Sequence, residues 1–277
     1  MSMYHQRPHV EDMRAMKRRG EKISMLYVTT PEEAEAASRA GIHMLSIESR
    51  FWSPLMREAA GNCFVQVGLP YGGTGTVDGQ HLVSADDYLR AAFRFSATGA
   101  DCFYCAASYD IQKVLCDNHV AIVGHIGVIP SYITWTGWRA VGKSAEEALA
   151  VWRHARRMEE IGVFGAELEV VPDRLGRFLS ENCSLIMLGM GAGRWADAQY
   201  LFTEDVCGYG RNRVPRHSKV YRQLGPQMAR LQEERIAAFT EFKADVDSGV
   251  YPATAHEVPM QDGEFDAFLS AVKSERV

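Results

Sequence analysis

The sequence has 277 residues, which suffices for one large domain of about 250 residues or for two smaller ones. Hydrophobic residues make up 47% of it, and 30 Lys and Arg stand against 35 Asp and Glu, giving a formal net charge of −5. This balance provides no basic surface for nucleic acid or an anionic membrane. No apolar run reaches the roughly 18 residues of a membrane span, and no signal peptide opens the chain. We therefore expect a cytoplasmic protein with a small-molecule substrate, and neither nucleic acid nor membrane as a partner.

Short apolar runs alternate with amphipathic stretches along the chain. After a lead-in helix expected within residues 1–21 (VEDMRAMKRR), eight runs have the length and composition of β-strands. They begin at Ile23, His43, Cys63, Asp101, Val120, Phe164, Leu185 and Ala198, and the last is the weakest. Helical patterns begin between them at Pro31, Ser84, Ser144 and Asp173. Ser84 and Ser144 each precede an acidic pair, which is a helix-start signal that agrees with this periodicity.

The alternation of strand and helix, repeated about eight times, requires parallel strands joined by crossover helices. We predict an α/β fold, namely a (β/α)8 TIM barrel; an open doubly wound sheet is the alternative because the eighth strand is weak. No linker interrupts the chain, so residues 1–277 are expected to form a single domain. Its C-terminal helical segment, 220–277, contains a long helix from Val220 that should pack on the barrel or on a neighbouring subunit. That helix carries an apolar stripe of Met228, Leu231, Ile236, Phe239 and Phe242.

Six cysteines are too few for a disulfide scaffold in a chain of this length. Only Cys102 and Cys105 have a spacing that suggests a metal or redox site. If they lie on a strand, residues three apart point to opposite faces and cannot hold one metal ion together. We interpret both as residues of the hydrophobic core.

Catalytic groups of parallel barrels gather at the carboxyl ends of the strands. Glu48 ends the second expected strand, His125 lies in the fifth, and the sixth contains Glu167 and Glu169. Because side chains alternate along a strand, the two glutamates share one face, about 6–7 Å apart. Such a pair is costly inside a barrel unless it is hydrogen-bonded, protonated or bound to cations, which favours a functional site over a frayed strand end. His125 alone is more typical of a core histidine.

Four motifs then follow in order. They are GHIGVIP at Gly124–Pro130, GWRAVGK at Gly137–Lys143, LEVVP at Leu168–Pro172 and LGMGAG at Leu188–Gly193. Their order and spacing resemble the ketopantoate hydroxymethyltransferase (3-methyl-2-oxobutanoate hydroxymethyltransferase) family, with its patterns GHxGLTPQ, GGYxVQGK, LECVP and IGIGAG. The resemblance implies a barrel of the phosphoenolpyruvate mutase superfamily, a homo-oligomer, chemistry at an enolisable 2-oxo acid, and a folate as one-carbon donor. It assigns His125 to the substrate-binding histidine and Glu169 to the proton-transfer glutamate.

The chain departs from the family at the magnesium site. The family holds the ion with an Asp after the second strand, an Asp ending the third and a Glu ending the fourth, and a Lys two residues before that Glu binds substrate. Here Glu48 or Ser49 takes the first position, Gly68 the second and Ala106 the third, and Tyr104 replaces the Lys. At most one ligand of three survives, so we expect the magnesium site to be largely lost.

A different metal site is the alternative to this loss. Imidazole and carboxylate ligands together suit a transition metal better than magnesium. The residues that could form such a rebuilt site are Glu48, His125, Glu167 and Glu169.

These observations lead us to expect a divergent enzyme that performs aldol-type or retro-aldol chemistry, either one-carbon transfer or carbon–carbon cleavage, on a small oxo or hydroxy acid. Glu169, with a pKa raised by Glu167, would move the proton, while His125 and Tyr104 hydrogen-bond the developing oxyanion. Glu48, Ser49, Glu167 and Arg194 are the candidates for substrate binding. Two alternatives stay open: a 3-methyl-2-oxobutanoate hydroxymethyltransferase with a rearranged metal site, and a non-catalytic barrel acting as a binding or assembly subunit.

Overall fold

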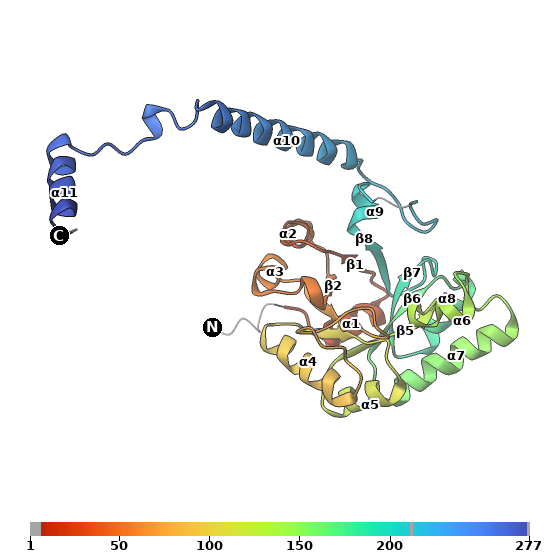
Figure 1. Ribbon diagram of the computed structural model, residues 1–277. Coiled ribbons are helices and arrows are strands. Elements are labelled where there is room, and N and C mark those ends of the chain that lie inside the picture. Colours follow the sequence, from red (N-terminus) through yellow and green to blue (C-terminus); the bar gives the residue numbers. More distant parts are fainter. Residues whose placement is uncertain (1–6, 211–212, 276–277) are drawn as a thin grey trace. The chain divides into compact units, whose positions relative to one another are not determined.

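The computed structural model describes residues 7–210 and 213–275, and the chain divides into two compact units, residues 1–222 and 223–277. Within the described part of the first unit, eight parallel strands form a closed barrel in the order of the sequence, and β8 pairs with β1 (Figure 1). The strands are β1 (Ile23–Tyr27), β2 (Met44–Glu48), β3 (Phe64–Gly68), β4 (Cys102–Tyr104), β5 (Ile122–Gly127), β6 (Gly165–Glu169), β7 (Ile186–Met190) and β8 (Ala198–Phe202). The (β/α)8 prediction is confirmed, and the doubly wound alternative is wrong, because the weak eighth strand closes the barrel.

Helices connect the strands on the outside of the barrel (Figure 1). They are α1 (Val10–Arg19), α2 (Pro31–Arg39), α3 (Pro54–Ala59), α4 (Ala85–Ala97), α5 (Tyr109–Asp117), α6 (Ile133–Thr136), α7 (Ala145–Glu160), α8 (Asp173–Asn182) and α9 (Thr203–Cys207). The predicted start signals act as N-caps: the hydroxyls of Ser84 and Ser144 accept hydrogen bonds from the backbone N–H groups of Asp87 and Glu147. Short 3-10 turns occur at Ser49–Phe51 (η2) and Pro130–Tyr132 (η3).

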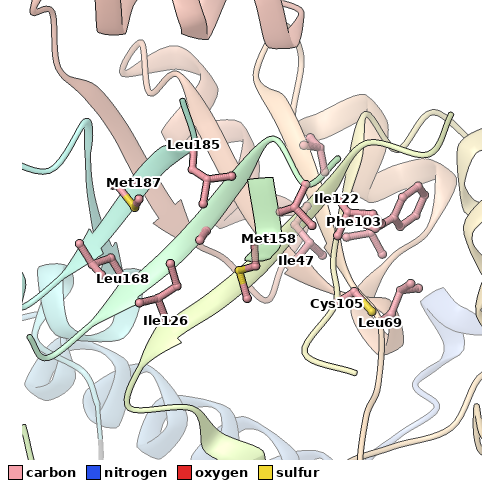
Figure 2. Close-up of a cluster of buried hydrophobic side chains, with 14 of the residues drawn as sticks. Ile47, Leu69, Phe103, Cys105, Ile122, Ile126, Met158, Leu168, Leu185 and Met187 are labelled. Carbon is pink, nitrogen blue, oxygen red and sulfur yellow. The ribbon is translucent and has the colours of Figure 1, made fainter. Parts of the chain in front are cut away.

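Two layers of apolar side chains hold the barrel together, because alternate strand residues point into it and away from it. The inner layer includes Met25, Met44 and Phe64. The outer layer packs between strands and helices, and Figure 2 shows part of it, with Met158 of α7 beside strand residues such as Ile126. Fully burying a side chain of this size contributes about 1.5–3 kcal/mol.

The core interpretation of the two closely spaced cysteines is confirmed. Cys102 and Cys105 are both buried, unoxidised and placed in different layers.

The second unit contains α10 (Gly225–Ser248), a 3-10 turn (Thr254–His256, η4) and α11 (Asp262–Glu275). The long helix begins at Gly225 and not at Val220 as predicted, because the backbone N–H groups of Tyr221 and Arg222 donate to the carbonyl of Val206 instead of continuing a helix. Within the described part of the second unit, the side chains of the apolar stripe on α10 are left more than half uncovered, from 51% exposed at Leu231 to 70% at Phe239. No helix in residues 7–210 or 213–275 is long and apolar enough to cross a membrane.

Candidate active site

A cavity of about 880 Å³ opens at the carboxyl ends of the strands. Six of the residues predicted for the site line it, and they are Glu48, Ser49, Tyr104, His125, Glu167 and Glu169. Strand register explains their proximity, since β5 and β6 pair His125 with Glu167 and Gly127 with Glu169.

Arg194 is not among the residues that line this cavity. It is exposed to solvent after Gly191 and Gly193, whose positive φ angles of 71° and 84° turn the chain beyond β7. It therefore does not join the six predicted residues in the cavity, and its role in substrate binding stays a prediction.

His125 lies at the centre of the polar cluster and is only 2% exposed. The Tyr104 hydroxyl is 2.8 Å from His125 Nδ1, and a Glu169 carboxylate oxygen is 3.1 Å from His125 Nε2. Burial, followed by the charge of Glu167, raises the pKa of Tyr104 well above its usual value, so the phenol keeps its proton. When the phenol donates to Nδ1, the imidazole proton lies on Nε2, a buried nitrogen that forms no hydrogen bond with any described residue.

Glu167 lies deeper in the barrel than Glu169. Gln66 Nε2 donates a 2.7 Å hydrogen bond to Glu167 Oε1, and His125 Nδ1 is 3.7 Å from Oε2. Burial raises the pKa of Glu167 to about 7, against the lowering effects of His125 and Gln66. The sequence predicted a raised pKa for Glu169. The structure places the raised value on Glu167, because this carboxyl group is the more deeply buried.

A second polar group is built around Glu48. Its carboxylate accepts a 2.6 Å hydrogen bond from the Tyr27 hydroxyl and one of 3.1 Å from Arg50 Nη2, and Arg50 Nε is 2.7 Å from the other oxygen. Sequence reasoning missed Arg50. Its place two residues after a strand-end glutamate was the available signal, but only the 3-10 turn η2 brings its guanidinium back to Glu48.

The backbone after Glu169 is strained. Val170 has a φ of 49°, in the left-handed region that β-branched residues rarely adopt, at a cost of about 1–3 kcal/mol. Two hydrogen bonds hold it there: Val170 N–H donates to the carbonyl of Met190 at 2.8 Å, and Val141 N–H donates to the carbonyl of Val170 at 3.2 Å. The backbone that directly follows Glu169 is thereby held by β7 and by the segment before α7.

The residues present do not fit a metal site of the family type. Gly68 and Ala106 offer no ligand atom in their side chains, and the Glu48 carboxylate is already neutralised by Arg50. Throughout the described residues, no three His, Cys, Asp or Glu side chains are grouped so that they could hold a metal ion. The rebuilt set of Glu48, His125, Glu167 and Glu169 is accordingly not assembled as a metal site.

The sequence profile of ketopantoate hydroxymethyltransferase matches residues 55–254. The chain belongs to this family. The 3-methyl-2-oxobutanoate hydroxymethyltransferase of Thermotoga neapolitana is 26% identical over 272 residues, covering 90% of this chain and 95% of the relative. The 3-methyl-2-oxobutanoate hydroxymethyltransferase of Pyrococcus abyssi is 30% identical over 190 residues, covering 67% of this chain and 64% of the relative. The family resemblance carried by the four motifs is confirmed, and family membership makes the chain an enzyme of the transferase type.

Solved structures support the fold. Rhizobium etli pyruvate carboxylase is similar with a TM-score of 0.53 and 14% identity over 72% of this chain and 25% of that one. A second similar structure is that of a protein from Burkholderia cenocepacia J2315 described as a phosphonomutase. It has a TM-score of 0.52 and 14% identity, and the match covers 84% of this chain and 99% of that one. At these identities the likeness shows the barrel fold alone.

Proposed function

We propose that this member of the ketopantoate hydroxymethyltransferase family performs aldol-type or retro-aldol chemistry on a small oxo or hydroxy acid without the magnesium ion of its family. The observation that carries the proposal is the Tyr104–His125–Glu169 cluster at the floor of a large cavity. Glu169 can act as a base there, and His125 and Tyr104 can donate hydrogen bonds. Enolate chemistry needs a base to remove the proton and donors to stabilise the oxyanion.

The reaction begins with Glu169 as the base. It removes a proton from the carbon next to the substrate carbonyl, and the electron pair of that C–H bond forms the enolate. Negative charge then develops on the carbonyl oxygen, which accepts hydrogen bonds from His125 Nε2–H and from the Tyr104 hydroxyl as it turns from Nδ1. The enolate carbon attacks the carbonyl of the second reactant, the new carbon–carbon bond forms, and the resulting alkoxide takes the proton back from Glu169. The retro-aldol direction reverses each step.

The cavity has room for both reactants. Its volume of about 880 Å³ lies near the upper end of the range for small-molecule sites, beyond what a small oxo acid fills. The remaining space suits a carbonyl compound or a larger one-carbon donor. Following the family, we also propose that the enzyme is a cytoplasmic homo-oligomer.

A ligand screen tests the proposal first. The protein, in buffer containing EDTA, is screened by thermal shift against 2-oxo acids, hydroxy acids, aldehydes and folates, and combinations that stabilise it are analysed for products. We expect stabilisation by an oxo or hydroxy acid and a product with one carbon–carbon bond made or broken.

Replacement of Glu169 by Gln then tests the proposed base. The variant keeps the shape of the side chain but cannot accept the proton, so turnover should fall by roughly 100-fold or more with binding nearly unchanged. The exposed Glu160→Gln on α7 is the matched control and should run at the wild-type rate. If Glu169→Gln turned over at the wild-type rate, another group would have to move the proton. Glu167 would be the next candidate.

A second candidate is the reaction named for the relatives. The Thermotoga neapolitana protein aligns over 95% of its length and is a 3-methyl-2-oxobutanoate hydroxymethyltransferase, which supports the same substrate here. Turnover of 3-methyl-2-oxobutanoate that EDTA abolishes and a divalent metal restores would support this candidate against the metal-free proposal. A protein that no compound stabilises would instead support the binding or assembly subunit.

A further inference from the structure

The charges around the cavity raise the question of what binds the carboxylate of an oxo acid. Five acidic side chains line the cavity, and they are Glu48, Glu167, Glu169, Glu204 and Asp205. Among the described residues that line it, the permanent cations are Arg50 and Arg213. An anionic substrate in such surroundings requires a cation with a fixed position.

Arg50 has such a position. It pairs with Glu48 through Nε at 2.7 Å and Nη2 at 3.1 Å, and Glu48 is itself held by the Tyr27 hydroxyl. The guanidinium carbon also lies 4.7 Å from the centre of the Phe51 ring. A guanidinium has five N–H donors, and these contacts with Glu48 use only the edge that carries Nε–H. The opposite edge, with one N–H from each terminal nitrogen, has the geometry that takes a carboxylate in two parallel hydrogen bonds. The side chain is 64% exposed, so this edge is accessible from the cavity that it lines.

The space beside Arg50 leads to the His125 cluster. Gly68 pairs with Glu48 on one side and with Tyr104 on the other, and strands two apart are separated by about 10 Å. A Cβ atom built on Gly68 would lie 3.6 Å from the Glu48 Cα and 3.9 Å from its Cγ, and the three atoms nearest to it all belong to β2 and none to Tyr104. Gly68 therefore has no side chain to fill the part of the cavity wall between Glu48 and Tyr104, both of which line the cavity.

We infer that Arg50 binds the carboxylate of the substrate, which lies over Gly68 with its carbonyl oxygen toward Tyr104 and His125. This inference rests on the proposed function and assigns the charge-neutralising role to a residue of the chain. Arg50 is thus a specificity residue for carboxylates, and Glu48 and Tyr27 position it.

The test measures binding, independently of turnover. Isothermal titration calorimetry of the full chain in EDTA compares 3-methyl-2-oxobutanoate with its uncharged methyl ester, for the wild type and for Arg50→Gln and Arg50→Lys. We expect Arg50→Gln to weaken binding of the acid by at least about 10-fold, since two charge-assisted hydrogen bonds to the carboxylate are lost. Binding of the uncharged ester should be unchanged. Arg50→Lys keeps the charge but cannot form the two parallel hydrogen bonds. Its affinity for the acid should therefore lie between those of the wild type and Arg50→Gln. The control is Arg39→Gln, an 80% exposed arginine on α2 outside the cavity, which should bind the acid like the wild type.

The outcomes separate the two proposals. Equal binding of the acid by the wild type and Arg50→Gln overturns the role of Arg50 and leaves the proposed function standing. An acid that the wild type binds only when magnesium is added also overturns it. If neither an oxo acid nor a hydroxy acid binds the wild type in the screen, the proposed function itself fails.

Discussion

At the residue scale, the site depends on where each ionisable group lies relative to water. Glu167 and Glu169 are two residues apart on one strand and both line the cavity, yet the Glu167 side chain, held by Gln66 and His125, is only 9% exposed, whereas that of Glu169 is 18% exposed. This difference in burial divides the work between them. The deeper carboxyl group has a pKa of about 7 and is therefore partly protonated at neutral pH, and in the proposed reaction the outer one meets the substrate.

Glu167 should make the stability of the protein depend on pH. Its pKa is about 7 in the folded chain against an ordinary 4.5, so the folded state binds more protons between these values and the free energy of unfolding falls as pH rises through this window. Glu167→Gln has no charge to bury at any pH. Urea unfolding at about pH 4.5 and pH 8 should therefore show a fall roughly 3 kcal/mol smaller for the variant than for the wild type. Parallel pH dependences would mean that Glu167 titrates normally.

The same residues show how far sequence reasoning reaches. Strand alternation and the family motifs placed Glu169 and His125 in the cavity, because both depend only on local period and strand order. The sequence did not predict a role for Arg50, because its contact with Glu48 depends on the 3-10 turn that brings the guanidinium back to the end of β2. Arg194 does not line the cavity because two glycines with positive φ precede it, and their effect on chain direction is not visible in a hydrophobic pattern.

At the scale of elements, the end of β5 supports the end of β6. Gly127 has a φ of 95°, and a Cβ atom on it would come within 2.1 Å of the Glu169 carbonyl oxygen. The carbonyl cannot move aside easily, because it also accepts a 3.0 Å hydrogen bond from Val128 N–H. Glycine at this position therefore sets the position of the proposed catalytic base.

Gly127→Ala should impair both stability and activity. Gly137→Ala is the matched control, since Gly137 also has a positive φ, of 67°, but nothing within 4 Å of its built Cβ. The control loses about 1–3 kcal/mol of unfolding free energy from backbone strain alone, because φ 67° with ψ 170° is a conformation almost restricted to glycine. Gly127→Ala should lose at least about 2 kcal/mol more, through the clash, and its turnover should fall beyond that of the control. Similar losses for the two variants in denaturant titrations would argue against the close approach.

Element boundaries were predictable where a local signal exists. Ser84 and Ser144 begin their helices through hydrogen bonds to residues three positions on, and both signals are written in the sequence. The start of α10 was misplaced by five residues because the preceding segment donates hydrogen bonds to Val206, a partner that only the folded chain brings near.

At the scale of the whole molecule, the N-terminal helix is tied to the barrel through one ion pair. Lys17 Nζ lies 2.8 Å from Asp197 Oδ2 and donates to the carbonyl of Leu185 at 2.6 Å. Asp197 also accepts from the backbone N–H of Met187, and burial raises its pKa. The pair thus joins α1 to β7 and to the segment just before β8.

Removal of Lys17 should be costly, because it leaves Asp197 buried without its cation. Lys17→Ala is expected to lower the free energy of unfolding by about 3 kcal/mol or more. Arg19→Ala, which removes a half-exposed pair between the last residue of α1 and Glu21 beyond the helix, should cost far less because this pair stays in water. Urea titrations at pH 7 measure the loss of unfolding free energy in both variants. Equal losses would show that α1 is anchored by its apolar contacts alone.

The apolar stripe of α10 bears on assembly. Met228, Leu231, Ile236, Phe239 and Phe242 are each more than half exposed in the single chain, whereas large contiguous apolar surfaces of soluble proteins usually mark contacts with partners. Covering one such side chain contributes about 1.5–3 kcal/mol, so a stripe of this length supports association of several copies. We therefore predict a homo-oligomer at micromolar concentration in sedimentation velocity. The double variant Ile236→Asp, Phe239→Asp should shift the sample toward monomer, while Gln232→Asp, a polar position on the same helix, should leave it assembled. A wild-type protein that sediments as a strict monomer would contradict this role for the helix.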